Sequence, residues 1–335
     1  MNILVIRFSA LGDVAIAAIA IESILKSNPD VNIWFLSKPF HKPLFNKNPR
    51  FHFIESDLKK NHKGIIGLKK LTTEILEKTK IDAVIDLHDV LRTKVIRRLL
   101  NNKVPEIYCF NKGRKKKKNM LEGKTPFKKL PHSVSRYLSC FNELGLNCEL
   151  QTGPWLTTNK NQEIISNKKQ IGIAPFAAHK SKEWGIKKIR SLISELKNVE
   201  IFLFGGGQNE IKQLVEISTQ FSNCTLVAGN YSFKEELEII AGLDLMISMD
   251  SANMHLATLV GTKVISIWGP THHFLGFGPL MNENLIVEID RKEMPTRPCS
   301  IYGKVTTSKQ KKCAANSMIN ISVNTVVAKI KSVIN

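Results

Sequence analysis

The sequence predicts an α/β protein with two parallel-sheet halves. In the first 110 residues, short apolar runs that do not alternate with polar residues, such as residues 3–7 (ILVIR), are separated by helical stretches of ten or more residues. Unalternated runs are typical of strands buried on both faces, and intervening helices imply βαβ units. The same alternation restarts near residue 170, and a length of 335 residues suits two domains.

The first half is predicted to hold five strands. We expect them at residues 3–7, 31–39, 51–55, 82–88 and 106–110, with helices at 13–30, 64–79, 90–100 and 132–146. Residues 111–131 are basic, contain Gly and Pro, and have little apolar periodicity, so we expect a long mobile loop. Residues 149–169 are polar and irregular and are predicted to link the domains.

The second half repeats the architecture without a close sequence repeat. Strands are expected at 170–175, 199–205, 224–229, 244–249, 263–269 and 285–290, with helices at 186–197, after Gly207, and at 232–243, 251–260 and 322–334. Ser232 and Glu235 form a predicted capping box. We therefore expect domains at 1–155 and 165–320, each Rossmann-like, with a cleft between them, and a last helix at 321–335.

Composition restricts the partners of the protein. The formal net charge is +20, which favours phosphorylated small molecules, nucleic acid or an anionic membrane face. Aromatic residues make up 7% and do not alternate with the basic runs, and no helix-turn-helix or zinc module is evident, which argues against specific nucleic-acid binding. No signal peptide is recognisable and the apolar run after Asp13 is too short to span a bilayer, so we expect a cytoplasmic protein.

The six cysteines lack any CxxC spacing. We expect them to be reduced thiols, as in a cytosolic protein; the alternative is that two of them, around a Lys-rich stretch, pair or bind metal. That pair is Cys299 and Cys313, and the others are Cys109, Cys140, Cys148 and Cys224.

A predicted phosphate site lies where the strand LMISM ends. Asp250 and Ser251 follow this strand and a helix starts at once, which leaves the amides of Ala252, Asn253 and Met254 open to an anion. The Ser251 hydroxyl can add a donor, whereas Asp250 suits sugar hydroxyls. The alternative is that Asp250 or Ser251 only caps the helix.

Three further stretches follow predicted strands and carry polar groups. Lys180 and Lys182 precede Trp184 and can neutralise a leaving phosphate, or they are solvated surface charges. Gly206 lies in a glycine triplet that allows close approach of a ligand, and Glu210 in the next helix can bind ribose; the alternative is a tight turn. Arg92 and Lys94 begin a helix and can hold an acidic acceptor, or they form its solvated face.

Asp13 stands at the start of the first helix, after the first strand. Ligands of parallel sheets bind beyond the carboxyl ends of the strands. A carboxylate there, facing an anomeric carbon beside a diphosphate, can serve as the general base for an acceptor hydroxyl. One carboxylate, with Lys182 and helix amides at the leaving diphosphate, would give inversion without a metal. The alternative is that Asp13 only caps its helix.

These motifs together resemble glycosyltransferase family 9, the ADP-heptose:lipopolysaccharide heptosyltransferases. The resemblance rests on ILVIRFSALGDV, DLHDVLRTK, HSVSRY, KEWG and MDSANMHLATLVGTKVISIWGPT, and covers essentially the whole chain. It implies a GT-B fold, with an interdomain cleft and a C-terminal helix that crosses back to the first domain. It also implies transfer of a heptose or related sugar from an ADP-sugar to an acidic lipid-linked saccharide, without a metal or other cofactor.

The resemblance also assigns residues. Gly12 and Asp13 match the family's Gly-Asp loop, with Asp13 as base, and Lys182 matches its phosphate lysine. Binding of the donor is implied for a set in the second half that comprises Lys180, Lys182, Gly206, Glu210, Tyr231, Ser232, Asp250, Ser251, Ala252, Asn253 and His255, together with Gly12. Binding of the acceptor is expected for a mostly basic set that comprises Arg92, Lys94, Arg114, Lys115, Lys116, His132 and Arg136.

Two departures from the family pattern concern the donor. Ala252 replaces the usual glycine, and Ala177 and Ala178 stand where small polar residues often precede the phosphate lysine. A UDP- or GDP-sugar transferase or epimerase is therefore an alternative, and a basic nucleic-acid-binding protein is a more distant one. The basic residues Lys115 to Lys118 suggest peripheral contact with the inner leaflet of the cytoplasmic membrane. We expect a monomer.

Overall fold

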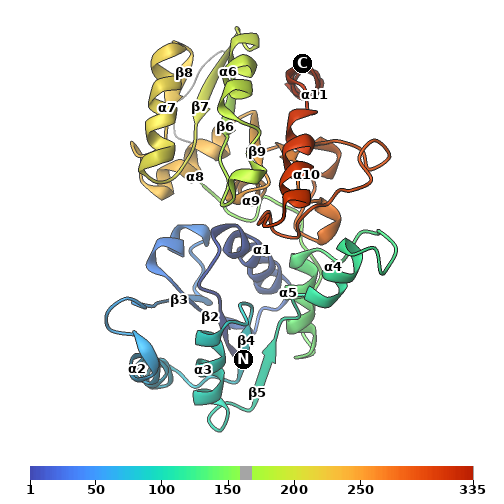
Figure 1. Ribbon diagram of the computed structural model, residues 1–335. Helices are drawn as coiled ribbons and strands as arrows, with labels where there is room; N and C mark the ends of the chain where they lie inside the picture. The colour runs from blue at the N-terminus through green and yellow to red at the C-terminus, as the bar shows by residue number, and fades with distance from the viewer. Residues whose placement is uncertain (159–167, 335) are drawn as a thin grey trace. The chain divides into compact units, whose positions relative to one another are not determined.

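The computed structural model describes residues 1–158 and 168–334, and the linker predicted at 149–169 and the domain start at 165 fall partly or wholly outside them. The described chain divides into two compact units, residues 1–112 with 133–156, and residues 113–132 with 157–335. Each unit holds one parallel sheet with helices packed against it (Figure 1). The two-sheet α/β prediction is confirmed.

The sheet of the first unit has the order β3-β2-β1-β4-β5, all parallel. Central β1 is apolar and buried from Ile3 to Ile6, and its Val5 pairs with Phe35 on one side and Ile85 on the other, all three unexposed. Helix α1 packs with α5, and α2 packs with α3. The elements are β1 (Asn2–Ile6), α1 (Leu11–Ser27), β2 (Asn32–Ser37), η1 (Pro39–Leu44), β3 (Phe51–Glu55), α2 (Gly64–Lys78), β4 (Ala83–Asp86), α3 (Leu91–Leu100), β5 (Glu106–Cys109) and α5 (Ser133–Asn142).

The sheet of the second unit has the order β11-β10-β9-β6-β7-β8, again parallel. Its central strands are buried on both faces, as the unalternated apolar runs predict. The elements are α4 (Arg114–Leu121), β6 (Lys169–Ala174), η3 (Lys180–Lys182), α6 (Ile186–Glu195), β7 (Val199–Leu203), α7 (Gln208–Gln220), β8 (Cys224–Leu226), α8 (Phe233–Gly242), β9 (Leu245–Met249), α9 (Ala252–Val260), β10 (Val264–Trp268), η4 (His273–Leu275), η5 (Glu283–Leu285), β11 (Ile286–Glu288), α10 (Ser308–Ile319) and α11 (Val323–Ile334).

The basic segment 113–132 differs from its prediction. It is not a mobile loop of the first domain: it contains α4 and belongs to the second unit. Met120 and Leu130 are buried against Leu275, with Phe127 and Phe274 packed beside them. These apolar partners lie about 150 residues away in sequence, so no local pattern reveals them.

The C-terminal region also differs from its prediction. The Lys-rich stretch after Gly303 forms α10, a helix that we did not expect, opened by a capping box of Thr307 and Gln310. Helix α11 is predicted to pack on the first domain, but its buried residues Val326 and Ile330 join the core of the second unit, where it packs on α6 and β11 (Figure 1).

Cys299 and Cys313 form a disulfide, with their Cα atoms 6.1 Å apart, so the expectation of reduced thiols is wrong for this pair. The other four cysteines are free. No helix in the described parts of the chain combines the length and hydropathy needed to cross a bilayer.

Gly276 allows segment 113–132 to pack against the rest of the second unit. Its φ is +91°, and an added Cβ would lie 2.5 Å from the carbonyl oxygen of Pro131. We predict that Gly276→Ala destabilises the second unit by about 1–2 kcal/mol from the backbone conformation alone, and releases segment 113–132 to limited trypsin digestion. Gly242→Ala is the control, because nothing lies within 4 Å of its added Cβ. Equal digestion of both variants would contradict the docking of this segment.

Candidate functional site

Asp13 is the third residue of α1, where the carboxyl end of β1 leads into the helix. Its side chain is 39% exposed, and its Oδ2 forms an ion pair with a guanidinium nitrogen of Arg7 at 2.6 Å. It also accepts the N–H of Ala10 at 3.3 Å, which is the N-cap residue. The capping alternative therefore holds in part, but the ion pair with Arg7 and the exposed carboxylate are not explained by capping. Gly12 is buried in the same turn, in the first unit.

Arg7 is held rigidly beneath Asp13. Its side chain is 5% exposed, and its guanidinium donates to the backbone carbonyl of Leu87. The guanidinium also lies 5.5 Å from the ring centroid of Tyr137 and 5.9 Å from that of Phe110. A buried cation with several partners has few alternative positions, so Arg7 fixes the orientation of the Asp13 carboxylate.

The end of β4 forms a second polar group in this unit. Asp86 is fully buried, and its Oδ1 accepts the N–H groups of His88 and Asp89 at 2.8 and 2.9 Å. The His88 ring accepts the N–H of Phe8 and contacts the Ser9 hydroxyl at 3.2 Å. Burial, and then the charge of Arg7, lower the pKa of His88 to about 4. His88 is thus a neutral ring that supports the loop before α1.

In the second unit, Lys182 and Asp250 lie side by side next to the predicted phosphate site at the start of α9. The Lys182 Nζ lies 3.1 Å from Oδ2 of Asp250, which also accepts the Thr271 hydroxyl at 2.7 Å. Lys182 and Asp250 are both buried, whereas Lys180 is exposed. The surface-charge alternative therefore describes Lys180 and not Lys182. A Cβ on Gly303 would lie 2.7 Å from Cδ of Lys182, so this segment covers the lysine stem.

Helix α9 begins directly after Asp250. Ser251 is its N-cap residue, but its hydroxyl makes no capping bond and instead lies 3.0 Å from the hydroxyl of Ser248. The Asp250 carboxylate is engaged by Lys182 and Thr271. The capping alternative is therefore not what the structure shows, and the first-turn positions, Ala252 and Asn253, are only half buried. An uncapped helix start beside a lysine favours an anion. His255 is buried in the second turn.

Two other predicted donor residues have local roles. Glu210 reaches back from the first turn of α7 and accepts the N–H of Gly206 at 2.8 Å. Ser232 is the N-cap of α8 and forms the predicted capping box with Glu235, at 3.3 and 2.7 Å. Tyr231 precedes it and is half buried. All these residues belong to the second unit.

The loop that carries Thr271 is organised by a buried arginine. Arg297 is 1% exposed and donates to the backbone carbonyls of Gly269 and Thr271 at 2.6 and 3.0 Å. Its charge is paired with Glu288, at 2.9 Å. Arg297 thus fixes the loop that carries Thr271, and the Thr271 hydroxyl in turn donates to Asp250.

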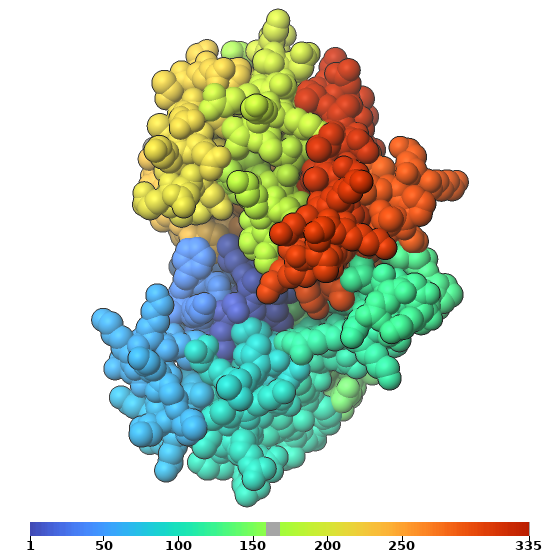
Figure 2. Space-filling model, viewed as in Figure 1, coloured from blue at the N-terminus to red at the C-terminus, as the bar shows by residue number. Residues whose placement is uncertain are grey.

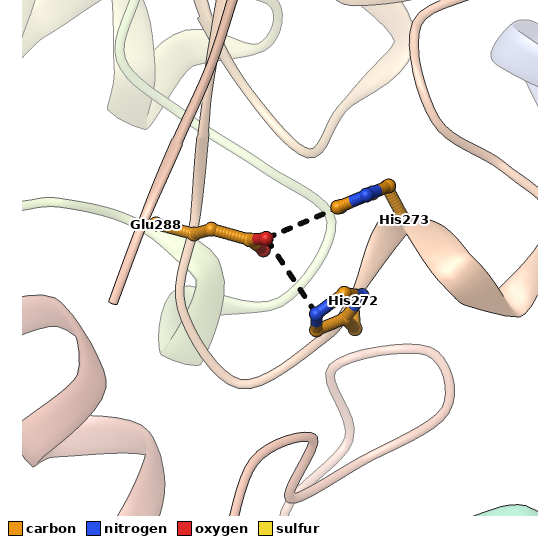
Figure 3. Close-up of side chains that lie close together, drawn as sticks. All are labelled: His272, His273 and Glu288. Carbon is orange, nitrogen blue, oxygen red and sulfur yellow. Dashed lines mark ion pairs between the residues drawn. The ribbon is translucent and has the colours of Figure 1, made fainter. Parts of the chain in front are cut away.

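His272 and His273 contact the other oxygen of Glu288, at 3.5 and 3.4 Å (Figure 3). Burial by itself would raise the pKa of Glu288, but the contacts with His273 and His272 and the charge of Arg297 lower it to about 2. The three side chains offer metal-ligand atoms within 4.8 Å of one another. However, Nδ1 of His272 accepts the N–H of Phe274, so a neutral ring carries its proton on Nε2, which faces Glu288. This tautomer suits a hydrogen-bonded cluster rather than a metal site.

The predicted acceptor residues divide between the two units. Arg92 and Lys94 lie exposed on α3, and Arg136 is half buried on α5, all in the first unit. The second unit contains the rest, so their assignment to the first domain is corrected. Arg114, Lys115 and Lys116 are exposed on α4, and His132 lies 3.0 Å from the carbonyl of Gly278.

Lys117 is buried, and its Nζ lies 4.2 Å from the ring centroid of Phe277. The run from Lys115 to Lys118 is therefore not a uniformly exposed cluster of charges.

The residue-by-residue reading of the sequence missed three side chains: Arg7, Thr271 and Arg297. Arg7 and Thr271 lie within the quoted motifs, six residues before Asp13 and two after Gly269. An arginine at the end of a fully apolar strand is a signal for a buried, paired cation. Arg297 lies in the stretch RPCSIYGK, and nothing in its neighbours indicates its partners.

Two buried histidines predict a pH dependence. Burial is the main cause that lowers the pKa of His88 and of His272 to about 4. The unfolded chain then binds more protons than the folded chain between pH 6.5 and 4, so stability is complete above pH 6.5 and falls on acidification. We predict a loss of about 1.5 kcal/mol per histidine between pH 6.5 and 5, measured by urea unfolding.

His88→Gln and His272→Gln should each flatten this pH dependence. A variant whose free energy of unfolding changes with pH as steeply as that of the wild type between pH 6.5 and 5 would contradict the neutral, buried state of the ring it replaces.

Comparison with known proteins shows the family to which the chain belongs. The family model described as glycosyltransferase family 9 (heptosyltransferase) matches residues 70–304, well over half of the chain. The chain is similar to the lipopolysaccharide core heptosyltransferase OpsX of Haemophilus influenzae, with 23% identity over 98% of this chain and 96% of the relative. It is 25% identical to the lipopolysaccharide heptosyltransferase 1 of Campylobacter coli, over 89% and 92% of the two chains.

Solved structures agree on the fold. A family 9 glycosyltransferase from Veillonella parvula superposes with a TM-score of 0.75 at 17% identity, covering 99% of this chain and 96% of that one. The E. coli ADP-heptose lps heptosyltransferase II gives 0.72 at 17% identity, over 99% and 98%. The fold class is thus the two-domain α/β fold of these enzymes. The chain belongs to glycosyltransferase family 9, the heptosyltransferase family, and is a glycosyltransferase.

Proposed function

We propose that this protein is an inverting heptosyltransferase that transfers a heptose from an ADP-sugar to an acidic, lipid-linked saccharide of the lipopolysaccharide core. The observation that carries the proposal is the half-exposed Asp13 carboxylate, held at the start of α1 by the buried Arg7. A carboxylate that is fixed in orientation and open to solvent can accept a proton from a bound hydroxyl. Similarity to lipopolysaccharide heptosyltransferases supports heptose as the sugar, and similarity to the E. coli ADP-heptose heptosyltransferase II supports ADP as the nucleotide.

The donor diphosphate is proposed to bind at the start of α9. The first-turn amides and the helix dipole favour its negative charge. Lys182 has three N–H donors, so it can keep its bond to Asp250 and still donate to a phosphate oxygen. Glu210 is proposed to accept from the ribose hydroxyls, at the cost of its bond to the Gly206 amide.

The transfer step is a single displacement. Asp13 takes the proton of the acceptor hydroxyl while that oxygen forms a bond to the anomeric carbon. The bond from this carbon to the diphosphate oxygen breaks, and its electron pair leaves on ADP. Lys182 and the amides of α9 stabilise the added charge on ADP. These protein groups carry the developing charges, and we propose that no metal is required.

The acceptor is proposed to bind through the basic side chains. Arg92, Lys94 and Arg136 are contributed by the first unit, and the exposed residues of α4 by the second. Because such an acceptor is anchored in a bilayer, we propose that the protein binds peripherally to the cytoplasmic face of the membrane. We also propose that it acts as a monomer. The net charge of +20 supports attraction to an anionic surface.

Asp13→Asn tests the base directly. The amide keeps the size of the side chain but cannot accept the proton, so we predict that kcat falls by about 10²–10⁴. Thermal stabilisation by ADP should be unchanged, because donor binding uses other residues. Asp30→Asn, an exposed acid of the same unit, is the control and should retain full turnover. Turnover of Asp13→Asn at the rate of this control would remove Asp13 from the mechanism.

Lys182→Ala and Lys180→Ala form a matched pair, since only Lys182 is buried beside Asp250. We predict that Lys182→Ala weakens ADP binding about 10–100-fold, the loss of one charged hydrogen bond, while Lys180→Ala changes it less than about threefold. Calorimetric titration gives both values, and thermal unfolding checks that each variant is folded. Equal losses in the pair would contradict the assignment of Lys182.

The same titration with UDP and GDP tests the alternative donors. Tighter binding of UDP or GDP than of ADP would replace the proposed nucleotide.

A further inference from the structure

The first turn of α2 carries two exposed isoleucines. Ile65 is 69% and Ile66 is 86% exposed. The core-facing residues of this helix begin one position later, at Gly67, and continue through Leu68, Leu71 and Ile75. The two isoleucines therefore contribute little to the core of the first unit. Adjacent exposed apolar side chains of this kind are a feature of interaction surfaces.

Lysines surround this pair. Residues 58–73 contain five lysines and no acidic residue. All five lysines are exposed. The α2 patch is defined here as the two isoleucines and these five side chains, namely Lys59, Lys60, Lys63, Ile65, Ile66, Lys69 and Lys70.

Two acidic groups flank the α2 patch in sequence, Asp57 and Glu74. The Asp57 carboxylate accepts the backbone N–H groups of Lys60 and Asn61, at 3.1 and 3.2 Å. Glu74 contacts Lys70 at 3.9 Å but also contacts the His62 ring at 3.2 Å. Helix α2 itself begins without a side-chain cap, and the partial charge of a helix N-terminus has the same sign as the lysines. Five lysines against these two carboxylates leave the patch with a net positive charge.

The loop before α2 is folded onto the helix rather than extended. A Cβ on Gly67 would lie 2.5 Å from the carbonyl carbon of His62, so the glycine permits the close approach of the loop. The His62 ring accepts the N–H of Asp57 at 3.0 Å. These contacts hold the loop lysines beside the first turn of α2. Figure 2 shows this segment in light blue at the surface of the first unit.

We propose that the α2 patch docks the protein on an anionic phospholipid bilayer. The isoleucines enter the boundary between headgroups and acyl chains, and the lysines contact lipid phosphates, the arrangement that interfacial helices use. Charge complementarity selects this occupant: an acidic surface with an apolar layer beneath it satisfies both parts of the patch. The proposal deepens the proposed function, on which its biological purpose rests, because it assigns the membrane contact to α2 rather than to Lys115–Lys118.

Vesicle flotation of the purified full-length protein tests the proposal, without any substrate. Vesicles contain phosphatidylcholine alone, or phosphatidylcholine with 25% phosphatidylglycerol. The apolar variant is Ile65→Ser with Ile66→Ser, and its control is Ile319→Ser, an isoleucine of the second unit with 66% exposure. The charge variant changes Lys59, Lys60 and Lys63 to Gln, and its control changes the exposed Lys309, Lys311 and Lys312 of α10 to Gln. All the changed side chains are exposed, so the variants should fold, and thermal unfolding confirms it.

We expect wild-type protein to float with the anionic vesicles and not with the neutral ones. The apolar and charge variants should each partition about tenfold more weakly, and both controls like wild type. Partitioning of the apolar or charge variant like wild type, or equal losses in a control, would overturn the proposal. Release by millimolar glycerol phosphate would also overturn it, because the patch would then bind a free phosphate and not a bilayer.

Failure of the proposed function is distinguishable from failure of this inference. Partitioning is measured without a sugar donor, so it can be lost while turnover of a detergent-solubilised acceptor is retained. The converse result, α2-dependent partitioning without heptose transfer, would leave the docking surface in place and remove only the proposed reaction.

Discussion

The ion pair between Arg7 and Asp13 is the interaction on which the proposed chemistry depends. A carboxylate in the first turn of a helix is favoured by the helix dipole, and it can be fully satisfied by capping. Here it is drawn at 2.6 Å to a guanidinium that is itself buried among Tyr137, Phe110 and the Leu87 carbonyl. The charge of Arg7 needs a partner in the interior, and Asp13 is that partner. Orientation of the proposed base is thus a consequence of burying an arginine at the end of β1.

The second unit uses the same principle with the signs reversed. A buried carboxylate, Asp250, is paired with Lys182 and the Thr271 hydroxyl, and Arg297 fixes the loop that supplies that hydroxyl. Lys182 is therefore already oriented beside the uncapped start of α9. A lysine that is positioned before the diphosphate arrives loses little conformational freedom on binding. The exposed Lys180 has no such support, although the two lysines look equivalent in sequence.

Much of the fold could be predicted from the sequence, because parallel strands buried on both faces have a distinctive composition. The capping box at Ser232 was also predictable, since both partners lie within four residues. The docking of 113–132 was not, because its apolar partners are distant in sequence. Helix α10 was not predicted, although its capping box is local. The pairing of Cys299 with Cys313 was open only as an alternative to reduced thiols, because their spacing matches no motif. Motifs in the sequence single out Asp13, Lys182 and Asp250 as candidate site residues. Arg7 was not singled out, because its key acceptor, Leu87, is 80 residues away.

A single displacement at the anomeric carbon inverts its configuration, whereas a double displacement retains it. Proton NMR of the purified product, compared with the donor sugar, gives the anomeric configuration on each side of the reaction. We predict that the configuration at the anomeric carbon is inverted. A product with the same configuration as the donor would require a second displacement or a front-side attack, and would contradict the role assigned to Asp13.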